Sequence, residues 1–292
     1  MLGHKVFQIL RERFTGVLGT TLQRLAEPPL DRVSLLRGDD VVSSVDVSDF
    51  AALRARLTTW KPEVIVNCVG VIKQREAAGA PIPTITLNAL FPHLLADAAA
   101  QWGGRVVHFS TDCVFSGRKG NYVETDVSDA EDLYGRSKFL GEVTTPNAIT
   151  LRTSIIGREL TDHRSLLDWF LSQHGKTVRG FRRVVYSGIT TNEMGNVVAR
   201  LIQEHPDLSG LFQVASRPIS KHDLLVLIRG AYGIDVTITP DDEEVSDRSM
   251  QGDKFAAATG WVAPPWPEMI RALAGDPTPY ADWGTSVLLN PQ

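Results

Sequence analysis

The stretch VIVNCVGVI at residues 64–72 decides the fold. It is apolar at nearly every position, which is typical of a strand buried between two layers of helices. Residues 106–109 and 148–153 are further β-branched runs, and the amphipathic stretches 50–60 and 87–102 lie between these runs. Strands that alternate with helices at this spacing predict an α/β fold of the Rossmann type, a doubly wound parallel sheet with right-handed crossovers.

The ends of these elements carry their own signals. Asp49 and Thr86 are expected to cap the two helices, and residues 33–36 are expected to form another strand. After about residue 155 the helices become longer and the strands shorter. We therefore expect residues 1–155 to form the Rossmann-like part, and residues 156–292 to form a smaller α/β lobe that folds over the sheet and is partly interleaved with it.

Composition excludes several classes of protein. The 292 residues carry 30 Lys and Arg against 34 Asp and Glu, without a basic block, so nucleic acid is not an expected partner. The longest apolar run contains Asn67 and is far shorter than the ~20 residues that a membrane span needs. Cys68 and Cys113 lie in apolar runs without CxxC spacing, which predicts buried, reduced thiols in a cytoplasmic protein. No histidine spacing is typical of a metal site.

Polar residues follow the predicted strands. They are Asp46-Val47, Asn67 to Gly70, and Ser110-Thr111-Asp112. Because the carboxyl ends of parallel strands line one crevice, these segments predict a ligand site there.

The segment LYGRSKFLGE at residues 133–142 places Tyr134 and Lys138 four residues apart, on one face of a helix. A neighbouring ammonium favours the phenolate, so we expect Lys138 to lower the pKa of Tyr134. A hydroxyl from Ser110 or Thr111 would hold the same substrate oxygen. Such a set can protonate a carbonyl oxygen while a nicotinamide delivers hydride to the carbon.

The stretch STDCVFSGRKGNYVETDVSDAEDLYGRSKFLGE at residues 110–142 resembles the core of the extended short-chain dehydrogenase/reductases. Within them it is most similar to the dTDP-4-dehydrorhamnose reductases, and the resemblance extends over nearly the whole chain. It implies an NADPH-dependent reductase of a nucleotide-linked 4-keto-deoxysugar, acting as a homodimer in deoxysugar and polysaccharide biosynthesis. Residues 1–155 would bind NAD(P) and the smaller lobe would bind the substrate.

The resemblance also implies roles for single residues. Thr111, Tyr134 and Lys138 would be catalytic, with Tyr134 protonating the nascent alkoxide. The residues implied to lie along the cofactor are Gly3, His4, Asp46, Val47, Asn67, Cys68, Val69, Gly70, Asn88, Ser110, Tyr134 and Lys138. Those implied to contact the substrate are Asp112, Cys113, Ile155 and Arg248, the last at its phosphates.

Two positions differ from the rhamnose-forming enzymes, which usually carry Tyr at 113 and Trp at 155. The difference favours another oxidised sugar nucleotide as substrate. For the cofactor, the segment 16–24 has no acidic residue placed for a ribose 2′-hydroxyl, whereas Arg24 could contact a 2′-phosphate. NADPH is therefore expected, with NADH as the alternative.

The family begins with a strand and a glycine-rich turn that ends in a motif like GxxGMLGH, and this chain starts at the Met of that ending. We expect an upstream stretch to encode the missing strand. Two other functions stay open. One is an epimerase or dehydratase of the same superfamily, and the other is a non-catalytic NADP-binding protein similar to the regulatory subunit of methionine adenosyltransferase.

Overall fold

A four-stranded parallel sheet forms the centre of the computed structural model, which describes residues 1–72, 80–161 and 164–283. The strands lie in the order β10 (Gly210–Gln213), β5 (Ala148–Thr153), β4 (Arg105–Thr111) and β3 (Val64–Asn67). The predicted parallel α/β architecture is confirmed. The expected strand at 64–71 ends early, because the Asn67 side chain accepts a hydrogen bond from the Val69 amide (3.0 Å) and turns the chain out of the sheet.

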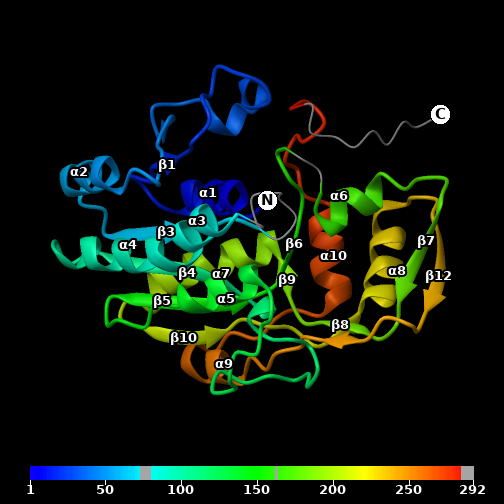
Figure 1. The fold of residues 1–292 in the computed structure, drawn as a ribbon. Helices are drawn as coiled ribbons and strands as arrows, with labels where there is room; N and C mark the ends of the chain where they lie inside the picture. Colours follow the sequence, from blue (N-terminus) through cyan, green and yellow to red (C-terminus); the bar gives the residue numbers. More distant parts are fainter. Residues whose placement is uncertain (73–79, 162–163, 284–292) are drawn as a thin grey trace.

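Strand β4 is buried along its whole length, and its side chains alternate between two helical layers. Val107 and Phe109 belong to the main core with residues of α1 (Leu2–Arg13) and α7 (Thr191–Glu204). Val106 faces the other side, in a core with residues of α2 (Phe50–Trp60) and α4 (Phe91–Ala100). The sheet therefore has helices on both faces, as a doubly wound fold requires (Figure 1).

The helix predicted at 87–102 begins earlier than expected. A continuous helical path runs from α3 (Pro81–Thr84) through a π-helical segment, η4 (Ile85–Leu90), into α4. The prediction that Thr86 caps a helix is wrong, because Pro81 occupies the first turn and Thr86 lies inside the π segment. Asp49 does cap α2, accepting a hydrogen bond from the Ala52 amide.

The predicted strand at 33–36 is also wrong. This region forms two 3-10 turns, η1 (Leu30–Arg32) and η2 (Ser34–Leu36), in which Leu30, Val33 and Leu36 recur every three residues. Residues at this spacing share one face of a 3-10 helix, and here they pack on Tyr280 and Trp283. The short strands β1 (Gly19–Thr20) and β2 (Val41–Val42) pair with each other in a separate parallel sheet.

The remaining elements lie beside this sheet. There α8 (Lys221–Tyr232) packs between α10 (Trp266–Ala274) and the paired strands β7 (Thr177–Phe181) and β12 (Thr237–Asp241) (Figure 1). Tyr186, Trp261 and Trp266 belong to the main core. The strands here are β6 (Ile155–Ile156), β7 (Thr177–Phe181), β8 (Val184–Tyr186), β9 (Ile189–Thr190), β11 (Ile219–Ser220), β12 (Thr237–Asp241) and β13 (Ser246–Asp247). The helices are α6 (Leu166–Leu171), α8 (Lys221–Tyr232), α9 (Asp253–Thr259) and α10 (Trp266–Ala274).

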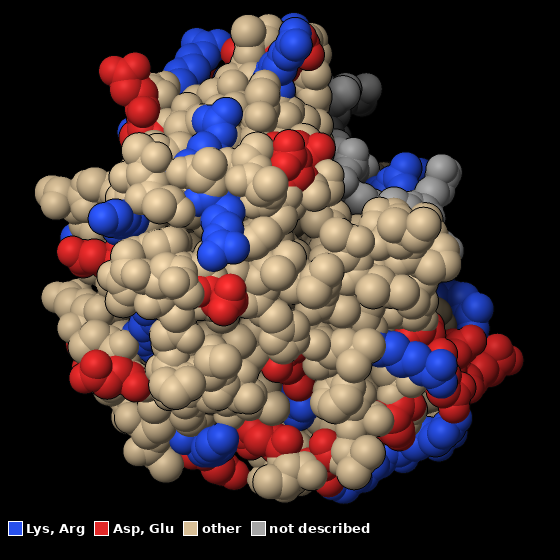
Figure 2. All heavy atoms as spheres, turned by 60° about the vertical axis from the view of Figure 1, so that its left-hand side comes forward, with Lys and Arg blue, Asp and Glu red and all other residues tan. Residues whose placement is uncertain are grey.

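The surface carries both signs of charge. On the face drawn in Figure 2, Lys and Arg side chains are interspersed with Asp and Glu. None of the helices in the described residues combines the length and the apolar character needed to span a membrane.

A buried ion pair joins the first helix to the segment after α10. Lys5 Nζ lies 2.7 Å from Asp276 Oδ2 and also donates to Thr278 Oγ1 at 2.7 Å. The two charged side chains are 3% and 5% exposed, so the pair is removed from water. Loss of one partner would leave the other charge buried without compensation.

Lys5→Met is therefore expected to lower the free energy of unfolding by about 3–5 kcal/mol. Urea denaturation followed by circular dichroism measures this change. The matched control is Lys176→Met, because Lys176 is exposed, and it should change stability by less than about 0.5 kcal/mol. Equal effects of the two substitutions would contradict the expectation.

Candidate active site

The carboxyl end of β4 carries the first group of predicted site residues. Thr111 ends the strand, and the 3-10 turn η5 (Asp112–Val114) follows it. Thr111 Oγ1 accepts a hydrogen bond from the Cys113 amide (3.1 Å) and donates one to Asp112 Oδ1 (3.1 Å). The hydroxyl thus caps the turn, and the fold fixes its position.

Helix α5 (Leu133–Leu140) brings Tyr134 and Lys138 to this turn. Asp132 caps the helix by accepting a hydrogen bond from the Gly135 amide (2.7 Å). Gly135 packs so closely on η5 that a Cβ there would lie 2.2 Å from the Cys113 carbonyl oxygen. Only glycine permits this approach, which holds Tyr134 beside Thr111.

Tyr134 is half-buried, and its pKa lies above the ordinary value for a tyrosine. Burial is the main cause, and the negative charges near Cys113, Asp112 and Asp132 add to it. A hydrogen bond between the Thr111 side chain and Tyr134 acts in the opposite direction. The expectation that Lys138 lowers this pKa is not met in this structure, so the phenol is a proton donor at neutral pH.

Lys138 is buried, and its ammonium points at the strand rather than into solvent. Nζ donates to the Phe109 carbonyl oxygen in β4 at 2.6 Å. Burial lowers the pKa of Lys138 to about 8, against the opposing effect of the Glu142 carboxylate. The charge of this amine therefore changes just above neutral pH.

Ser110 is held by a network that the sequence did not indicate. Its hydroxyl donates to Glu142 Oε1 (2.7 Å), and Arg152 binds the same carboxylate through Nε and Nη2, both at 2.7 Å. The two charged side chains are 2% and 6% exposed. Ser110 is thus engaged with a buried ion pair, whereas the Thr111 hydroxyl donates to Asp112 alone and would turn from that carboxylate to bind a substrate oxygen. Glu142 lies four residues after Lys138, and this helical spacing was the available signal for it.

The turn after β3 carries the predicted cofactor residues Asn67 to Gly70. Asn67 is buried and donates from Nδ2 to His108 Nδ1 at 3.1 Å. Cys68, Val69 and Gly70 are exposed. Burial was predicted for both thiols. The residue Cys68 is exposed as a whole, just beyond the last paired residue of β3, but burial of its Sγ raises the pKa of the thiol to about 12. Cys113 is half-buried.

Asn88, in the π-helical segment, joins that turn to α5. It accepts a hydrogen bond from the Val71 amide (2.8 Å) and donates to the Val71 carbonyl (2.9 Å) and to Ser137 Oγ (3.2 Å). A Cβ on Gly70 would lie 3.0 Å from Asn88 Oδ1, so the chain passes this amide closely. The turn is consequently adjacent to the helix that carries Tyr134 and Lys138.

The other predicted cofactor residues are placed differently. Gly3 lies against Cys68, where a Cβ would be 3.3 Å from the Cys68 Cβ. His4 is buried with Nε2 2.8 Å from the Tyr280 hydroxyl, and burial lowers its pKa well below the usual range. Asp46 is exposed, and hydrogen bonds from Ser48 lower its pKa.

Val47 is half-buried against the core that includes Val106. Arg24, expected near a 2′-phosphate, is exposed and lies 3.4 Å from Glu27.

On the predicted substrate side, Arg248 reaches the turn after β4. Its Nε donates to the Phe115 carbonyl at 2.9 Å. Ile155 pairs with Ile189 and packs on the main core. Lys221 and Tyr186 also act electrostatically on Asp112, although no local motif marks either residue, because their partners lie far away in the sequence.

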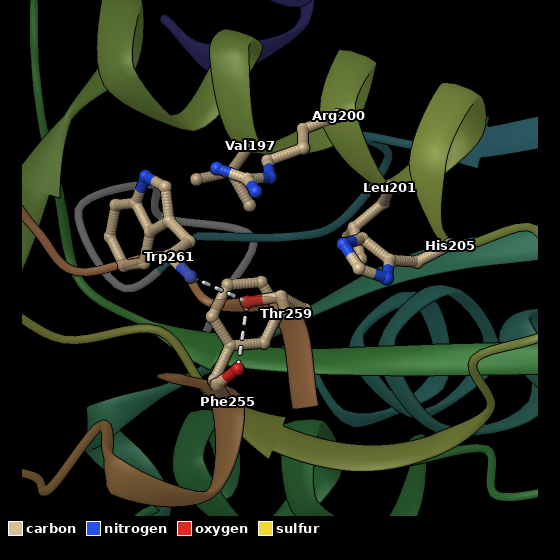
Figure 3. A pocket seen from close by; sticks show the side chains of 7 residues that line it. All are labelled: Val197, Arg200, Leu201, His205, Phe255, Thr259 and Trp261. Carbon is tan, nitrogen blue, oxygen red and sulfur yellow. Dashed lines mark hydrogen bonds between the residues drawn. The ribbon is translucent and has the colours of Figure 1, made fainter. Parts of the chain in front are cut away.

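The rest of the described structure offers neither a metal site nor a second reactive cluster at the hollow drawn in Figure 3. The described residues contain no group of three or more His, Cys, Asp or Glu side chains that could hold a metal ion. Figure 3 shows a hollow between α7 and α9, where Val197, Leu201, Phe255 and Trp261 are core side chains. This hollow has no room for a water molecule, so it is a packing gap of the hydrophobic core and not a ligand site.

Comparison with known proteins gives the family. The RmlD substrate binding domain family matches residues 8–233, which is most of the chain. The chain belongs to this family. The matched residues include β4, η5 and α5. The family match therefore covers Thr111, Tyr134 and Lys138.

Its curated relatives include a subunit of methionine adenosyltransferase and dTDP-4-dehydrorhamnose reductases. Methionine adenosyltransferase 2 subunit beta of Xenopus tropicalis is 30% identical over 142 residues, 49% of this chain and 39% of that protein. The dTDP-4-dehydrorhamnose reductase of Salmonella typhimurium is 33% identical over 148 residues, 48% of each chain. The chain thus spans about half or less of the length of these relatives.

Solved structures agree on the fold. The dTDP-4-dehydrorhamnose reductase of Bacillus anthracis, in complex with NADP, superposes with a TM-score of 0.71 at 19% identity, over 88% of this chain and 97% of that one. The UDP-glucose 4-epimerase of Thermus thermophilus, in complex with NAD, gives 0.73 at 15% identity over 94% of each chain. At these identities the likeness concerns the Rossmann-like fold alone.

The Glu142 network gives a test of what fixes the site. Arg152→Met leaves the Glu142 carboxylate buried with only the Ser110 hydrogen bond, and should lower the free energy of unfolding by about 3–5 kcal/mol. Ser110→Ala removes one hydrogen bond to a charged group and should cost about 1.5–3 kcal/mol. Urea denaturation measures both changes, and an Arg152→Met variant no less stable than Ser110→Ala would show that the ion pair does not hold β4, β5 and α5 together.

Proposed function

We propose that the chain is an NADPH-dependent reductase of a nucleotide-linked 4-keto-deoxysugar, similar to dTDP-4-dehydrorhamnose reductase, in deoxysugar biosynthesis. Residues 1–155 would hold the cofactor, and residues 156–292 would contribute most of the substrate contacts. The family and the relatives named as reductases support this reaction class.

One observation carries the proposal. Thr111, at the carboxyl end of β4, lies close enough to Tyr134 of α5 to act on its phenol, and Lys138 follows Tyr134 by one helical turn with its ammonium anchored on the same strand. A hydroxyl, a protonated phenol and an amine so arranged can bind a carbonyl oxygen and protonate it. The Tyr134 proton is retained at neutral pH, which suits an acid that acts in the direction of reduction.

The residues present fit a dinucleotide cofactor at the turn after β3. Cys68, Val69 and Gly70 are exposed beside the Asn88 link to α5, so their backbone groups are accessible next to Tyr134 and Lys138. Asn67 would fix the shape of this turn. NADPH, when bound there, supplies hydride to the carbonyl carbon.

The chain's own residues would perform the proton chemistry. Thr111 donates a hydrogen bond to the substrate oxygen and orients it. Tyr134 gives its phenolic proton to that oxygen as negative charge develops there. Lys138, one helical turn from Tyr134, keeps an ammonium anchored on β4 below pH 8, which would offset the negative charge that proton transfer leaves in the site.

Tyr134→Phe tests the assignment, because it removes only the proton donor. Its rate of NADPH oxidation with dTDP-4-dehydrorhamnose should fall by about 10²–10⁴-fold, while the affinity for NADPH changes less than about threefold. Absorbance of NADPH measures the rate, and NADPH fluorescence titration measures binding.

Tyr232→Phe is the matched control, because it removes a phenol that donates to the Leu273 carbonyl outside the site. It should keep the wild-type rate. Wild-type protein that binds NADPH but oxidises none with a panel of 4-keto sugar nucleotides would contradict the reductase function.

The pH dependence follows from Lys138. Its pKa of about 8 means that the ammonium is lost as pH rises through that value, so kcat/KM should fall about tenfold per pH unit above pH 8. Lys138→Arg keeps its charge throughout this range, and its remaining activity should lack this alkaline fall. A wild-type profile flat to pH 10, or a fall that persists in Lys138→Arg, would contradict the assignment to Lys138.

A second function is favoured by the similarity to methionine adenosyltransferase 2 subunit beta. In that case the chain would bind NADP without turnover and act on a partner protein. NADPH binding without NADPH consumption separates this function from the reductase. A cytoplasmic location and a homodimer stay predictions, and oligomeric state is measured by light scattering.

A further inference from the structure

Two cations emerge beside the central strand of a small sheet. Strand β8 lies between β11 and β13, with Ser220 and Asp247 both aligned on Val185. Lys221 follows β11 directly, and Arg248 follows β13 directly. The topology therefore places both cations next to β8.

The Lys221 side chain is held by aromatic packing. Its Nζ lies 4.2 Å from the centroid of the Tyr186 ring, and that ring packs on Trp266 at 5.5 Å. Across residues 1–72, 80–161 and 164–283, no hydrogen bond or ion pair occupies the Lys221 ammonium. The cation–π contact fixes the ammonium without using its N–H donors.

This sheet docks on the turn that follows Thr111. Arg248 Nε donates to the Phe115 carbonyl at 2.9 Å, and the Asp247 amide donates to the Gly117 carbonyl at 2.7 Å. The docking brings Lys221 within electrostatic range of β4: burial lowers the pKa of Lys221, whereas Asp112 and Cys113 raise it and Arg248 lowers it further. Lys221 thus lies within electrostatic range of the turn that follows Thr111.

Asp112 is the natural counterpart of this cation. The carboxylate is 8% exposed and accepts the Thr111 hydroxyl at 3.1 Å. Within the described part of the chain it has no cation within 4.0 Å, so Lys221 is near but not in contact. An acceptor and a donor are therefore both available beside Thr111.

We propose that Asp112 and Lys221 together bind one hydroxyl group of the substrate's sugar ring, which makes Lys221 a specificity-determining residue. This inference rests on the proposed function. A hydroxyl can donate to the carboxylate and accept from the ammonium at once, whereas a phosphate or carboxylate would meet the negative charge of Asp112.

The test measures binding of dTDP-glucose, UDP-glucose and the free nucleotides dTDP and UDP by isothermal titration calorimetry. The sugar's contribution is the ratio of the affinities for the nucleotide sugar and its free nucleotide. Lys221→Met should lower this ratio about tenfold or more, the loss of a hydrogen bond to a charged group, while affinity for the free nucleotide changes less than threefold. Lys221→Arg should lower it less, because the charge remains.

Lys254→Met is the matched control. Lys254, an exposed residue of α9, also lies over an aromatic ring, with Nζ 4.6 Å from the Phe212 centroid. Its Nζ donates to the Leu211 carbonyl in β10 at 2.7 Å. It should bind both kinds of ligand like the wild type. Thermal denaturation of each variant confirms folding, and Lys221→Arg replaces Lys221→Met if the latter does not fold.

The outcomes separate this inference from the function beneath it. Wild-type protein that binds nucleotide sugars, with unchanged binding by the Lys221 variants, overturns the inference and leaves the reductase proposal standing. Equal losses for dTDP-glucose and dTDP assign Lys221 to the phosphates and overturn the hydroxyl contact. Wild-type protein that binds none of the four ligands overturns the nucleotide-sugar function, and this contact with it.

Discussion

The Glu142 carboxylate is the interaction on which the arrangement of the site depends. Strands β4 and β5 pair in a register that sets Ser110 opposite Arg152, so a hydroxyl and a guanidinium lie side by side on one face of the sheet. Glu142 spans both groups from the end of α5. A buried carboxylate is stable only when a cation balances its charge and donors bind its lone pairs. Ser110 and Arg152 therefore fix the position of Glu142, and with it the end of α5. Lys138 lies one turn before that point and Tyr134 one turn earlier again, and their placement follows.

The same burial that fixes these groups also sets their charge. Desolvation favours the neutral form of every titratable group, so it raises the pKa of Tyr134 and lowers that of Lys138. In the chain alone, the phenol keeps its proton and the amine approaches neutrality near pH 8. Negative charge brought in by a ligand beside Lys138 would restore the ammonium, because an opposite charge favours the ionised form. Acid chemistry at Tyr134 is thus coupled to the presence of a bound anion.

Sequence periodicity predicted the elements whose burial is decided locally. Residues 148–153 and 50–60 have the predicted limits, since their apolar residues pack in the two cores that cover the faces of the sheet. The strand prediction for residues 33–36 was wrong because their packing partners, Tyr280 and Trp283, lie some 250 residues later in the sequence. Contact with these two rings favours the three-residue repeat of a 3-10 helix. The strand that begins at Val64 ends at Asn67, earlier than predicted, because the Asn67 side chain accepts a hydrogen bond from the Val69 amide.

The residues of the candidate site likewise fall into those that local sequence marks and those that only tertiary contacts place. The spacing of Tyr134 and Lys138 within one helix marked them, whereas the engagement of Ser110 depends on a carboxylate that only folding brings to it. Lys221 has no local signal, because its place beside Asp112 depends on the docking of β8 and its neighbours onto residues 115–122. That docking is itself built from backbone contacts: Asp247 to Gly117, Tyr122 to Ser249, and Gln251 to Tyr122.

The two sources of site residues differ in what they constrain. Thr111 is the last residue of β4, and Lys138 is anchored on that strand through the Phe109 carbonyl, so a change at either residue disturbs both chemistry and fold. Lys221 projects from a sheet that is joined to that turn by backbone hydrogen bonds and by the Arg248 side chain, so the Lys221 side chain can change while these contacts remain. Substrate selection can therefore diverge in this fold without displacing the proton donor, because docking and recognition use different atoms of the same segment.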